Sequence, residues 1–235
     1  MLLGDTSAPG PVLGSNSDSK VFVNFADHGG AGLICTPQSR SKNWIYADEL
    51  DSTFQQMKDT GMFGELVFYL EACESGSMFP NLDSTENIFA VSASNATQSS
   101  YAAYCGRDAK VNGTKIGSCL GDLFSINWME DTEANNVSVE TLQEQFDTVL
   151  KETTASPVMK FGDFSFMSEP IGDFEGTVDG SASILGKTVH NAFKLINKFT
   201  HYSGHTKEHG QMVDSREHKL HFLIEQAEIL GTREA

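Results

Sequence analysis

Hydrophobic residues occur along this chain in short runs that end in polar or glycine-containing turns. Residues 21–26 and residues 66–70 form two such runs, rich in β-branched and aromatic side chains, which is typical of buried strands. Between them, residues 48–62 carry apolar positions at helical spacing: Leu50, Phe54, Met57 and Met62. A strand, a helix and a second strand in this order predict a parallel pair, whose carboxyl ends lie at the same edge of a sheet.

Later elements continue this alternation. The pattern predicts a helix over 138–154 and a strand over 158–161, which complete the α/β layer. Residues 163–186 are rich in Gly, Ser and acidic residues, which is typical of a linker, and helices are predicted over 187–199 and 215–230. The expected organisation is an α/β domain (1–163), a linker (164–186) and the start of a helical region (187–235).

A histidine and a cysteine follow the two predicted strands. His28 lies in Asp-His-Gly-Gly after the first, and Cys73 lies in Glu-Ala-Cys-Glu-Ser-Gly after the second. A cysteine attacks as its thiolate, and a neighbouring imidazole can act as its base. The backbone N–H groups of Gly29 and Cys73 are natural donors to an oxyanion, each contributing about 2.7–4 kcal/mol to the transition state. A cysteine that only fills space and a histidine that only hydrogen-bonds are the alternatives.

Several motifs resemble the legumain family of asparaginyl endopeptidases, also called vacuolar processing enzymes. The resemblance runs in order from Leu2 to Gly162, and 213–220 resembles the segment that follows the catalytic domain. The matching motifs are Asp27-His28-Gly29-Gly30, Val67-Phe-Tyr-Leu-Glu71-Ala-Cys73-Glu-Ser-Gly-Ser77-Met78, Ser94-Asn95 with Ser99-Ser100-Tyr101, and Cys119-Leu-Gly121-Asp122-Leu-Phe-Ser125 through Asn127-Trp128-Met129-Glu130-Asp131. The resemblance implies a caspase-like α/β fold, a mostly parallel sheet flanked by helices, with a C-terminal helical tail.

The resemblance also implies roles for the site residues. It makes Cys73 the nucleophile and His28 its partner, and it places the oxyanion hole at the amides of Gly29 and Cys73. Asp27, next to the histidine, is a matched position too, although an ordinary turn role is its alternative.

A pocket for the Asn side chain before the cleaved bond is implied in the same way. Its matched positions are Glu71, Ser100 and Asp122. Carboxylates accept hydrogen bonds from an amide NH₂, and a site built on such bonds rejects side chains that lack them. Glu71 and Ser100 as ordinary polar residues, and Asp122 as the N-cap of the next helix, are the alternatives.

Both ends of the chain differ from the family pattern. The first strand and helix of the family, which supply an Asn beside the catalytic pair and an Arg-His pair in the pocket, would precede Met1. The peptidase domain over 1–163 is therefore expected to be incomplete at its N-terminus, and 187–235 to be only the start of the activation or prodomain region. Family members are processed after Asn here, which makes Asn191 and Asn197 candidate cleavage sites, with ordinary helix-surface positions as the alternative.

Length and charge limit the classes of function. The chain has 235 residues, of which 39% are hydrophobic, enough for a substantial core, and no run approaches the ~18 apolar residues that span a bilayer. A net charge of −16 argues against nucleic acid and anionic membranes as partners. Zinc-ligand spacing is absent, so neither a metal nor a cofactor is expected.

Cysteines and sequons suggest a secretory route. By resemblance to plant-type legumains, Cys105 and Cys119 form a disulfide, worth about 3 kcal/mol in the chain-entropy model. Cys35 is expected to be a buried free thiol. Glycosylation candidates are Asn95, Asn112 and Asn136. The resemblance implies a vacuole, a lysosome or secretion, although the N-terminus shows no signal-peptide pattern.

Taken together, the residues and the resemblance predict a cysteine endopeptidase that cleaves after Asn, and after Asp at acidic pH, through an acyl-enzyme. Transpeptidation follows if an amine replaces water. Expected partners are proteins and peptides with accessible Asn and, by resemblance, cystatin-type inhibitors. The alternatives are an inactive fragment that binds peptides or inhibitors, and a relative of the glycolipid-anchor transamidase.

Overall fold

A four-stranded sheet forms the centre of the computed structural model, which describes residues 1–7, 10–37, 44–176 and 209–231. The strand order is β1 (Lys20–Ala26), β5 (Glu65–Glu71), β6 (Ile88–Ser92) and β11 (Met159–Gly162). β1, β5 and β6 are mutually parallel, and β11 is antiparallel to β6. The predicted parallel pair is confirmed, since Ala26 lies opposite Glu71 at its carboxyl end.

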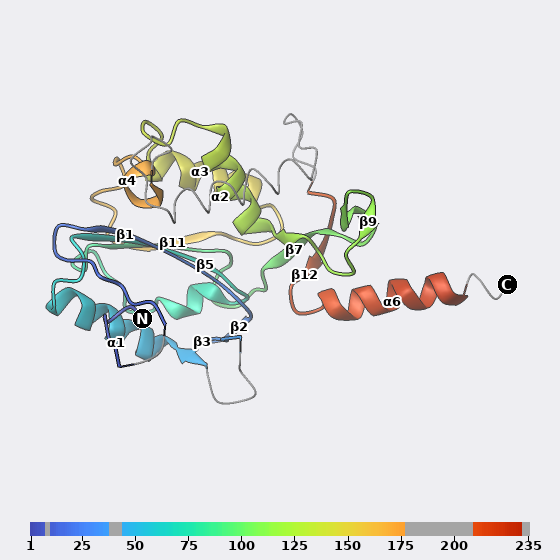
Figure 1. Ribbon diagram of the computed structural model, residues 1–235, viewed down its shortest axis with the longest axis horizontal. Helices are drawn as coiled ribbons and strands as arrows, with labels where there is room; N and C mark the ends of the chain where they lie inside the picture. Colours follow the sequence, from blue (N-terminus) through green and yellow to red (C-terminus); the bar gives the residue numbers. More distant parts are fainter. Residues whose placement is uncertain (8–9, 38–43, 177–208, 232–235) are drawn as a thin grey trace.

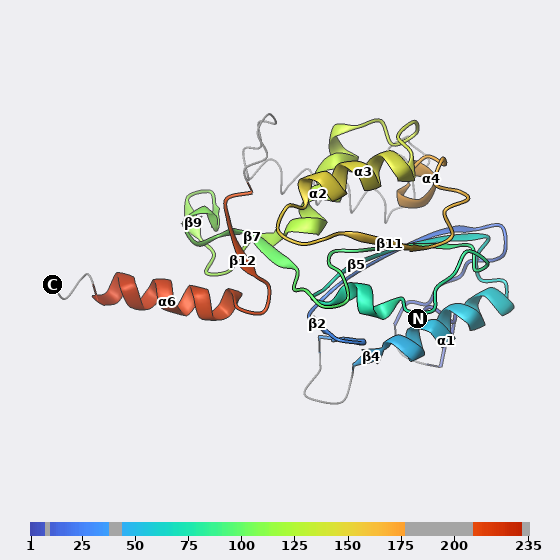
Figure 2. The ribbon, with the colours of Figure 1, turned by 180° about the vertical axis from the view of Figure 1, so that it is seen from behind.

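Helices cover both faces of this sheet (Figures 1 and 2). The predicted first helix is α1 (Ala47–Asp59), which lies on one face. The other face carries α2 (Leu123–Ala134), α3 (Leu142–Glu152) and the short α4 (Gly172–Glu175). The expected α/β class, with a parallel-rich sheet between helices, is confirmed and is consistent with a caspase-like fold.

Alternation along β5 explains why one strand supports two cores. Successive side chains of a strand point to opposite faces. Val67 and Tyr69 belong to the core under α2, α3 and α4, whereas Leu66 and Phe68 belong to the core over α1. Because β5 is buried on both faces, its sequence is a continuous apolar run rather than an alternating one.

The helix expected over 138–154 is shorter than predicted. The Thr141 hydroxyl accepts a hydrogen bond from the backbone N–H of Glu144 (3.2 Å), and the Glu144 carboxylate accepts one from the backbone N–H of Thr141 (2.9 Å). This capping box starts α3 at Leu142. Asn136 starts a turn in the preceding residues, where its side-chain oxygen accepts from the backbone N–H of Ser138 (3.2 Å).

The first part of the expected linker over 164–186 belongs instead to the packed domain. Phe166, Met167, Ile171 and Phe174 are buried in the core under α2 and α3. These apolar residues are spaced among acidic and glycine residues, so composition alone indicated a linker. Residues 177–186 and the predicted helix over 187–199, with Asn191 and Asn197, lie outside the described residues.

A second, antiparallel sheet lies beside the first and includes the C-terminal segment. Its order is β10 (Gly121–Asp122), β7 (Tyr101–Cys105) and β12 (Gln211–Asp214). The helix expected over 215–230 is α6 (His218–Gly231), which extends away from the body (Figure 1). It starts later than predicted because 214–217 form a turn, with the Glu217 N–H donating to the Asp214 carbonyl (2.8 Å).

Short elements complete the described chain. A small three-stranded antiparallel sheet consists of β2 (Gly29–Gly30), β3 (Leu33–Ile34) and β4 (Ile45–Tyr46). A separate hairpin joins β8 (Lys110–Val111) to β9 (Thr114–Lys115). Single 3₁₀ turns are η1 (Ser75–Met78) and η2 (Gly106–Asp108). Among the described residues, no helix has the length and apolar character needed to cross a bilayer.

Candidate active site

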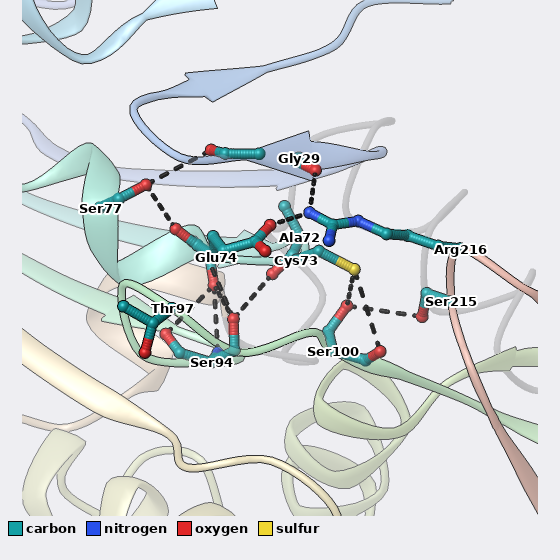
Figure 3. A network of polar contacts seen from close by, with 12 residues as sticks. Gly29, Ala72, Cys73, Glu74, Ser77, Ser94, Thr97, Ser100, Ser215 and Arg216 are labelled. Atoms are coloured by element: carbon teal, nitrogen blue, oxygen red, sulfur yellow. Dashed lines mark hydrogen bonds and ion pairs between the residues drawn. The ribbon is translucent and has the colours of Figure 1, made fainter.

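Cys73 lies in a tight turn that follows β5, and its residue is 1% exposed. The next residue, Glu74, has φ of +48°, a left-handed conformation that reverses the chain into η1. The hydroxyl of Ser94 fixes this turn from the end of β6, because it donates to the Ala72 carbonyl (3.1 Å) and accepts from the Ser75 N–H (3.2 Å). Figure 3 shows this network around the sulfur.

The histidine follows the neighbouring strand. The Asp27 N–H donates to the Glu71 carbonyl (3.2 Å), so the two chains stay together one residue beyond the β1–β5 ladder. The Asp27 carboxylate accepts from the His28 N–H (2.7 Å), which is a turn role. The His28 imidazole stacks on that of His218, with 6.1 Å between ring centroids.

Gly29 allows the histidine loop to touch the cysteine turn. A Cβ at this position would clash with the Cys73 carbonyl oxygen and would lie 2.9 Å from the Ala72 Cβ. Only glycine therefore fits at this approach. Gly29 lies against Cys73, although it does not line the cavity described next.

One cavity of about 270 Å³ brings most of the predicted site residues together. From the predicted set, its lining includes Asp27, His28, Glu71, Cys73, Ser100 and Asp122. The Cys73 sulfur lies 3.8 Å from the Ser100 hydroxyl oxygen and 4.0 Å from the Ser100 carbonyl oxygen. The cysteine, the histidine and the acidic residues thus share one solvent space, although they come from four separate segments.

Two buried acids give the cavity its electrostatic character. Two causes raise the pKa of Glu71 to about 8: burial is the larger, and the nearby Asp122 carboxylate is the second. Hydrogen bonds to its carboxylate from the N–H (2.8 Å) and hydroxyl (2.9 Å) of Ser125 oppose this shift. Burial also raises the pKa of Asp122, against the Ser215 hydroxyl and the nearby imidazoles of His218 and His28. Both groups consequently hold protons at higher pH than free carboxyls do.

Asp122 does occupy the N-cap position of α2, but its side chain does not cap the helix. Its carboxylate instead accepts a hydrogen bond from the hydroxyl of Ser215 (2.9 Å), which lies 93 residues further along the chain.

Residues 215–218 are functional-site neighbours that sequence reasoning did not place. Ser215 and His218 line the cavity, and the Arg216 guanidinium donates to the Gly29 carbonyl (3.0 Å) and forms an ion pair with Glu74. The pairing of β12 with β7 brings this segment there, since Asp214 lies opposite Tyr101. The only sequence signal was the family-like segment over 213–220, which carries no information about its position in space.

The remaining predicted positions are distributed around the site. Cys105 and Cys119 form the expected disulfide, and Cys119 lines the cavity. Cys35 forms no disulfide, as expected, but it is half-buried rather than buried, and it directly follows the short strand β3. Of the three sequon residues, Asn112 and Asn136 are exposed and Asn95 is half-buried.

A cysteine and a histidine at the carboxyl ends of adjacent parallel strands, beside an acidic cavity, are the arrangement of a cysteine hydrolase. Residues 1–177 match the Peptidase C13 family. The chain belongs to this family of cysteine peptidases, which confirms the resemblance found in the sequence.

Curated relatives agree with this assignment. A vacuolar-processing enzyme from Vicia sativa is 39% identical over 205 residues, which cover 83% of this chain and 41% of the relative. A hemoglobinase from Schistosoma mansoni is 38% identical, covering 78% of this chain and 41% of the relative. A legumain from Mus musculus is 35% identical, covering 75% and 39%. The chain thus spans about two fifths of the length of these relatives.

Proposed function

We propose that this chain is an asparaginyl endopeptidase, in which Cys73 is the nucleophile and His28 the general base. The observation that carries the proposal is the common cavity that both residues share with Glu71 and Asp122. Family membership supports the peptidase class, and the names of the relatives, legumain and vacuolar-processing enzyme, support the vacuole or lysosome as location.

In the proposed mechanism, the Cys73 sulfur adds to the carbonyl carbon of the substrate Asn while its proton passes to His28. The backbone N–H groups of Gly29 and Cys73 stabilise the resulting oxyanion. Collapse breaks the C–N bond, and His28 gives the proton to the leaving amine. Water then adds to the thioester carbonyl with His28 as base, which releases the acid and restores the thiol. An amine in place of water forms a new peptide bond, which is transpeptidation.

The proposed pocket for the Asn side chain consists of Glu71, Ser100 and Asp122. The carboxamide NH₂ of the substrate Asn donates to acidic oxygens of the pocket. The carboxamide oxygen of the same Asn accepts from a hydroxyl or from a protonated carboxyl. The raised pKa of Glu71, about 8, supports a carboxyl that carries a proton at the mildly acidic pH of a vacuole or lysosome. Substrates are therefore proteins and peptides with accessible Asn, and cystatin-type inhibitors are proposed ligands of the same cleft.

A second candidate function has a specific observation in its favour. Ser215 and His218 already line the cavity, and Ser215 is hydrogen-bonded to Asp122. A chain whose own C-terminal segment stays in this place would bind peptides or inhibitors weakly and would not turn them over. A transamidase-type relative is less favoured, because the matched relatives are named as vacuolar-processing enzymes, a hemoglobinase and legumains.

Hydrolysis of a fluorogenic Ala-Ala-Asn peptide tests the proposal. The rate should be measured between about pH 4.5 and about pH 7, after incubation in acid, beside a Cys73→Ala variant. Turnover that depends on Cys73 supports the endopeptidase. A folded chain without turnover supports the binding function instead.

A further inference from the structure

Acyl transfer at the proposed site requires two loops to keep a fixed separation. The turn after β5 supplies Cys73, and the hairpin of β2 and β3 supplies His28 and the Gly29 amide. The β1–β5 ladder ends at Ala26 and Glu71, before either reactive residue. Some contact beyond the ladder must therefore set the distance between the loops, because small displacements of reacting groups reduce rates strongly.

One backbone hydrogen bond, from the Asp27 N–H to the Glu71 carbonyl (3.2 Å), extends the ladder by a residue. Beyond it, backbone contact brings the loops together but does not fix them. The Gly29 Cα lies against the Cys73 carbonyl with no room for a Cβ. A contact of this kind limits how closely the loops approach, whereas it does not prevent them from separating. Directional hydrogen bonds are needed for that.

Ser77 makes these bonds. Its hydroxyl accepts from the Gly32 N–H at the tip of the β2–β3 hairpin (2.8 Å) and donates to the Glu74 carbonyl in the cysteine turn (2.6 Å). The Gly30 carbonyl oxygen lies 3.4 Å from the same hydroxyl. Figure 3 shows Ser77 between the strand that carries Gly29 and the turn that carries Glu74. One hydroxyl thus joins the two loops.

Other polar side chains near the site do different things. Ser94 fixes the cysteine turn to the end of β6 and does not reach the hairpin. Arg216 also bridges the loops, through Gly29 and Glu74, but it comes from the exposed C-terminal segment that lines the cavity. Among the described residues of the domain that precedes this segment, Ser77 is the side chain whose hydrogen bonds connect hairpin and turn.

The geometry points to Ser77 as a positioning residue, which holds the hairpin of His28 and Gly29 in register with the Cys73 turn through one shared hydroxyl. This inference rests on the proposed peptidase function. Ser77 touches no substrate; it acts through the two loops. Its removal should lower kcat while substrate binding in the pocket of Glu71 and Asp122 changes little.

The test compares Ser77→Ala with Ser77→Thr, which keeps the hydroxyl, and with Ser52→Ala. Ser52 is a matched control, because its hydroxyl also donates to a backbone carbonyl, that of Asp48 (2.7 Å), on the exposed side of α1. With the Ala-Ala-Asn peptide, Ser77→Ala should reduce kcat by about tenfold or more with KM within about twofold. Ser77→Thr should recover most of the rate, and Ser52→Ala should match the parent chain.

Two further measurements separate positioning from folding and from failure of the proposed function. Thermal unfolding gives the folded fraction to which kcat is normalised. The rate of Cys73 alkylation by iodoacetamide against pH, read by peptide mapping to exclude Cys35, needs no peptide turnover. Ser77→Ala should change this pH profile, and Ser52→Ala should not.

Each outcome decides one of the two proposals. If the parent chain turns over peptide and Ser77→Ala keeps its normalised kcat and alkylation profile, Ser77 has only a structural role and the inference is overturned. If the parent chain shows no turnover, the peptidase function fails, and the alkylation profile alone decides whether Ser77 positions the loops.

Discussion

The hydroxyl of Ser215 donates a hydrogen bond to the carboxylate of Asp122, with 2.9 Å between Oγ and Oδ1. The same hydroxyl lies 3.4 Å from that of Ser100. Two of the three residues proposed to hold a substrate Asn are therefore already in contact with the C-terminal segment. If Asp122 accepts from a substrate carboxamide as proposed, Ser215 competes for the same acceptor, and we expect the position of residues 215–218 to affect access to the cavity.

Weakening the attachment of this segment should raise activity. Arg216→Ala removes the ion pair with Glu74 and the hydrogen bond to the Gly29 carbonyl. A partly exposed pair of this kind contributes about 0.2–1 kcal/mol, so initial hydrolysis of the Asn peptide should increase about 1.4- to fivefold. Lys219→Ala, at an exposed position on α6, is the control. Equal or lower rates for Arg216→Ala would show that the segment does not limit access.

The two cysteines outside the disulfide, Cys35 and Cys73, allow a direct test of the proposed nucleophile. Cys73→Ala should reduce turnover by at least about 10³-fold, because the covalent step is lost while the fold remains. Cys35→Ser should keep turnover, since Cys35 lies at the end of β3 and does not line the cavity. Peptide hydrolysis and thermal unfolding of both variants provide the measurement. Retained turnover in Cys73→Ala would assign the chemistry to another group.

Selectivity between Asn and Asp substrates should depend on pH. The pKa values of Glu71, about 8, and of Asp122 are raised by burial, so both acids take up protons as the pH falls. An ionised pocket repels a substrate Asp, whose own pKa is about 3.9, and a protonated pocket accepts it. The ratio of kcat/KM for Asp over Asn should therefore rise as the pH falls through about 8, where Glu71 takes up its proton, and should rise further as Asp122 takes up its own.

The Asp122→Asn variant tests the same prediction, because it removes one charge from the pocket and keeps the shape of the side chain. This change should raise the Asp-over-Asn ratio near neutral pH and flatten its dependence on pH. A ratio that stays constant with pH in the parent chain would place the specificity elsewhere.

The free energy of unfolding should fall as the pH rises, because of acids that are remote from the cavity. Two main causes raise the pKa of Glu140 to about 8: burial is the largest, and a hydrogen bond shared with the Asp131 carboxyl is the second. Burial raises the pKa of Glu175 to about 7. The folded chain therefore binds more protons than the unfolded chain between about pH 4.5 and about pH 8, and the free energy of unfolding falls across this interval.

Urea unfolding at several pH values checks this expectation. Glu140→Gln should make the free energy of unfolding less dependent on pH, with a gain on the order of 1 kcal/mol at the alkaline end after allowance for solvent screening. Asp147→Asn, at an exposed position on α3, which begins two residues after Glu140, should leave the slope unchanged. A parent chain whose stability rises over this interval would contradict the argument.

Local sequence signals were sufficient for the elements that carry the reactive residues. The buried runs over β1 and β5 and the amphipathic α1 were readable because each has one clear periodicity. The common cavity of His28 and Cys73 follows from the rule that parallel strands with a helical crossover end at one edge.

Long-range pairing was not readable from the sequence. Nothing in residues 211–214 indicates that they pair with β7, because the signal of a four-residue strand is weak and its partner lies far away in sequence. Phe166 and Phe174 were assigned to a linker because they are spaced among acidic and glycine residues, although they complete the core under α2 and α3. Ser77 was visible only as part of a motif, and the role proposed for it rests on the hydrogen bonds across two loops.

The register of β1 against β5, from Lys20 with Glu65 to Ala26 with Glu71, has a consequence for biosynthesis. His28 and Cys73 lie on opposite sides of the α1 crossover, so no local fragment contains both residues. Pairing of distant strands forms slowly compared with a helix, because the loop between them must close first. During translation, the nascent chain consequently cannot bring His28 and Cys73 together until β5 has left the ribosome and joined β1.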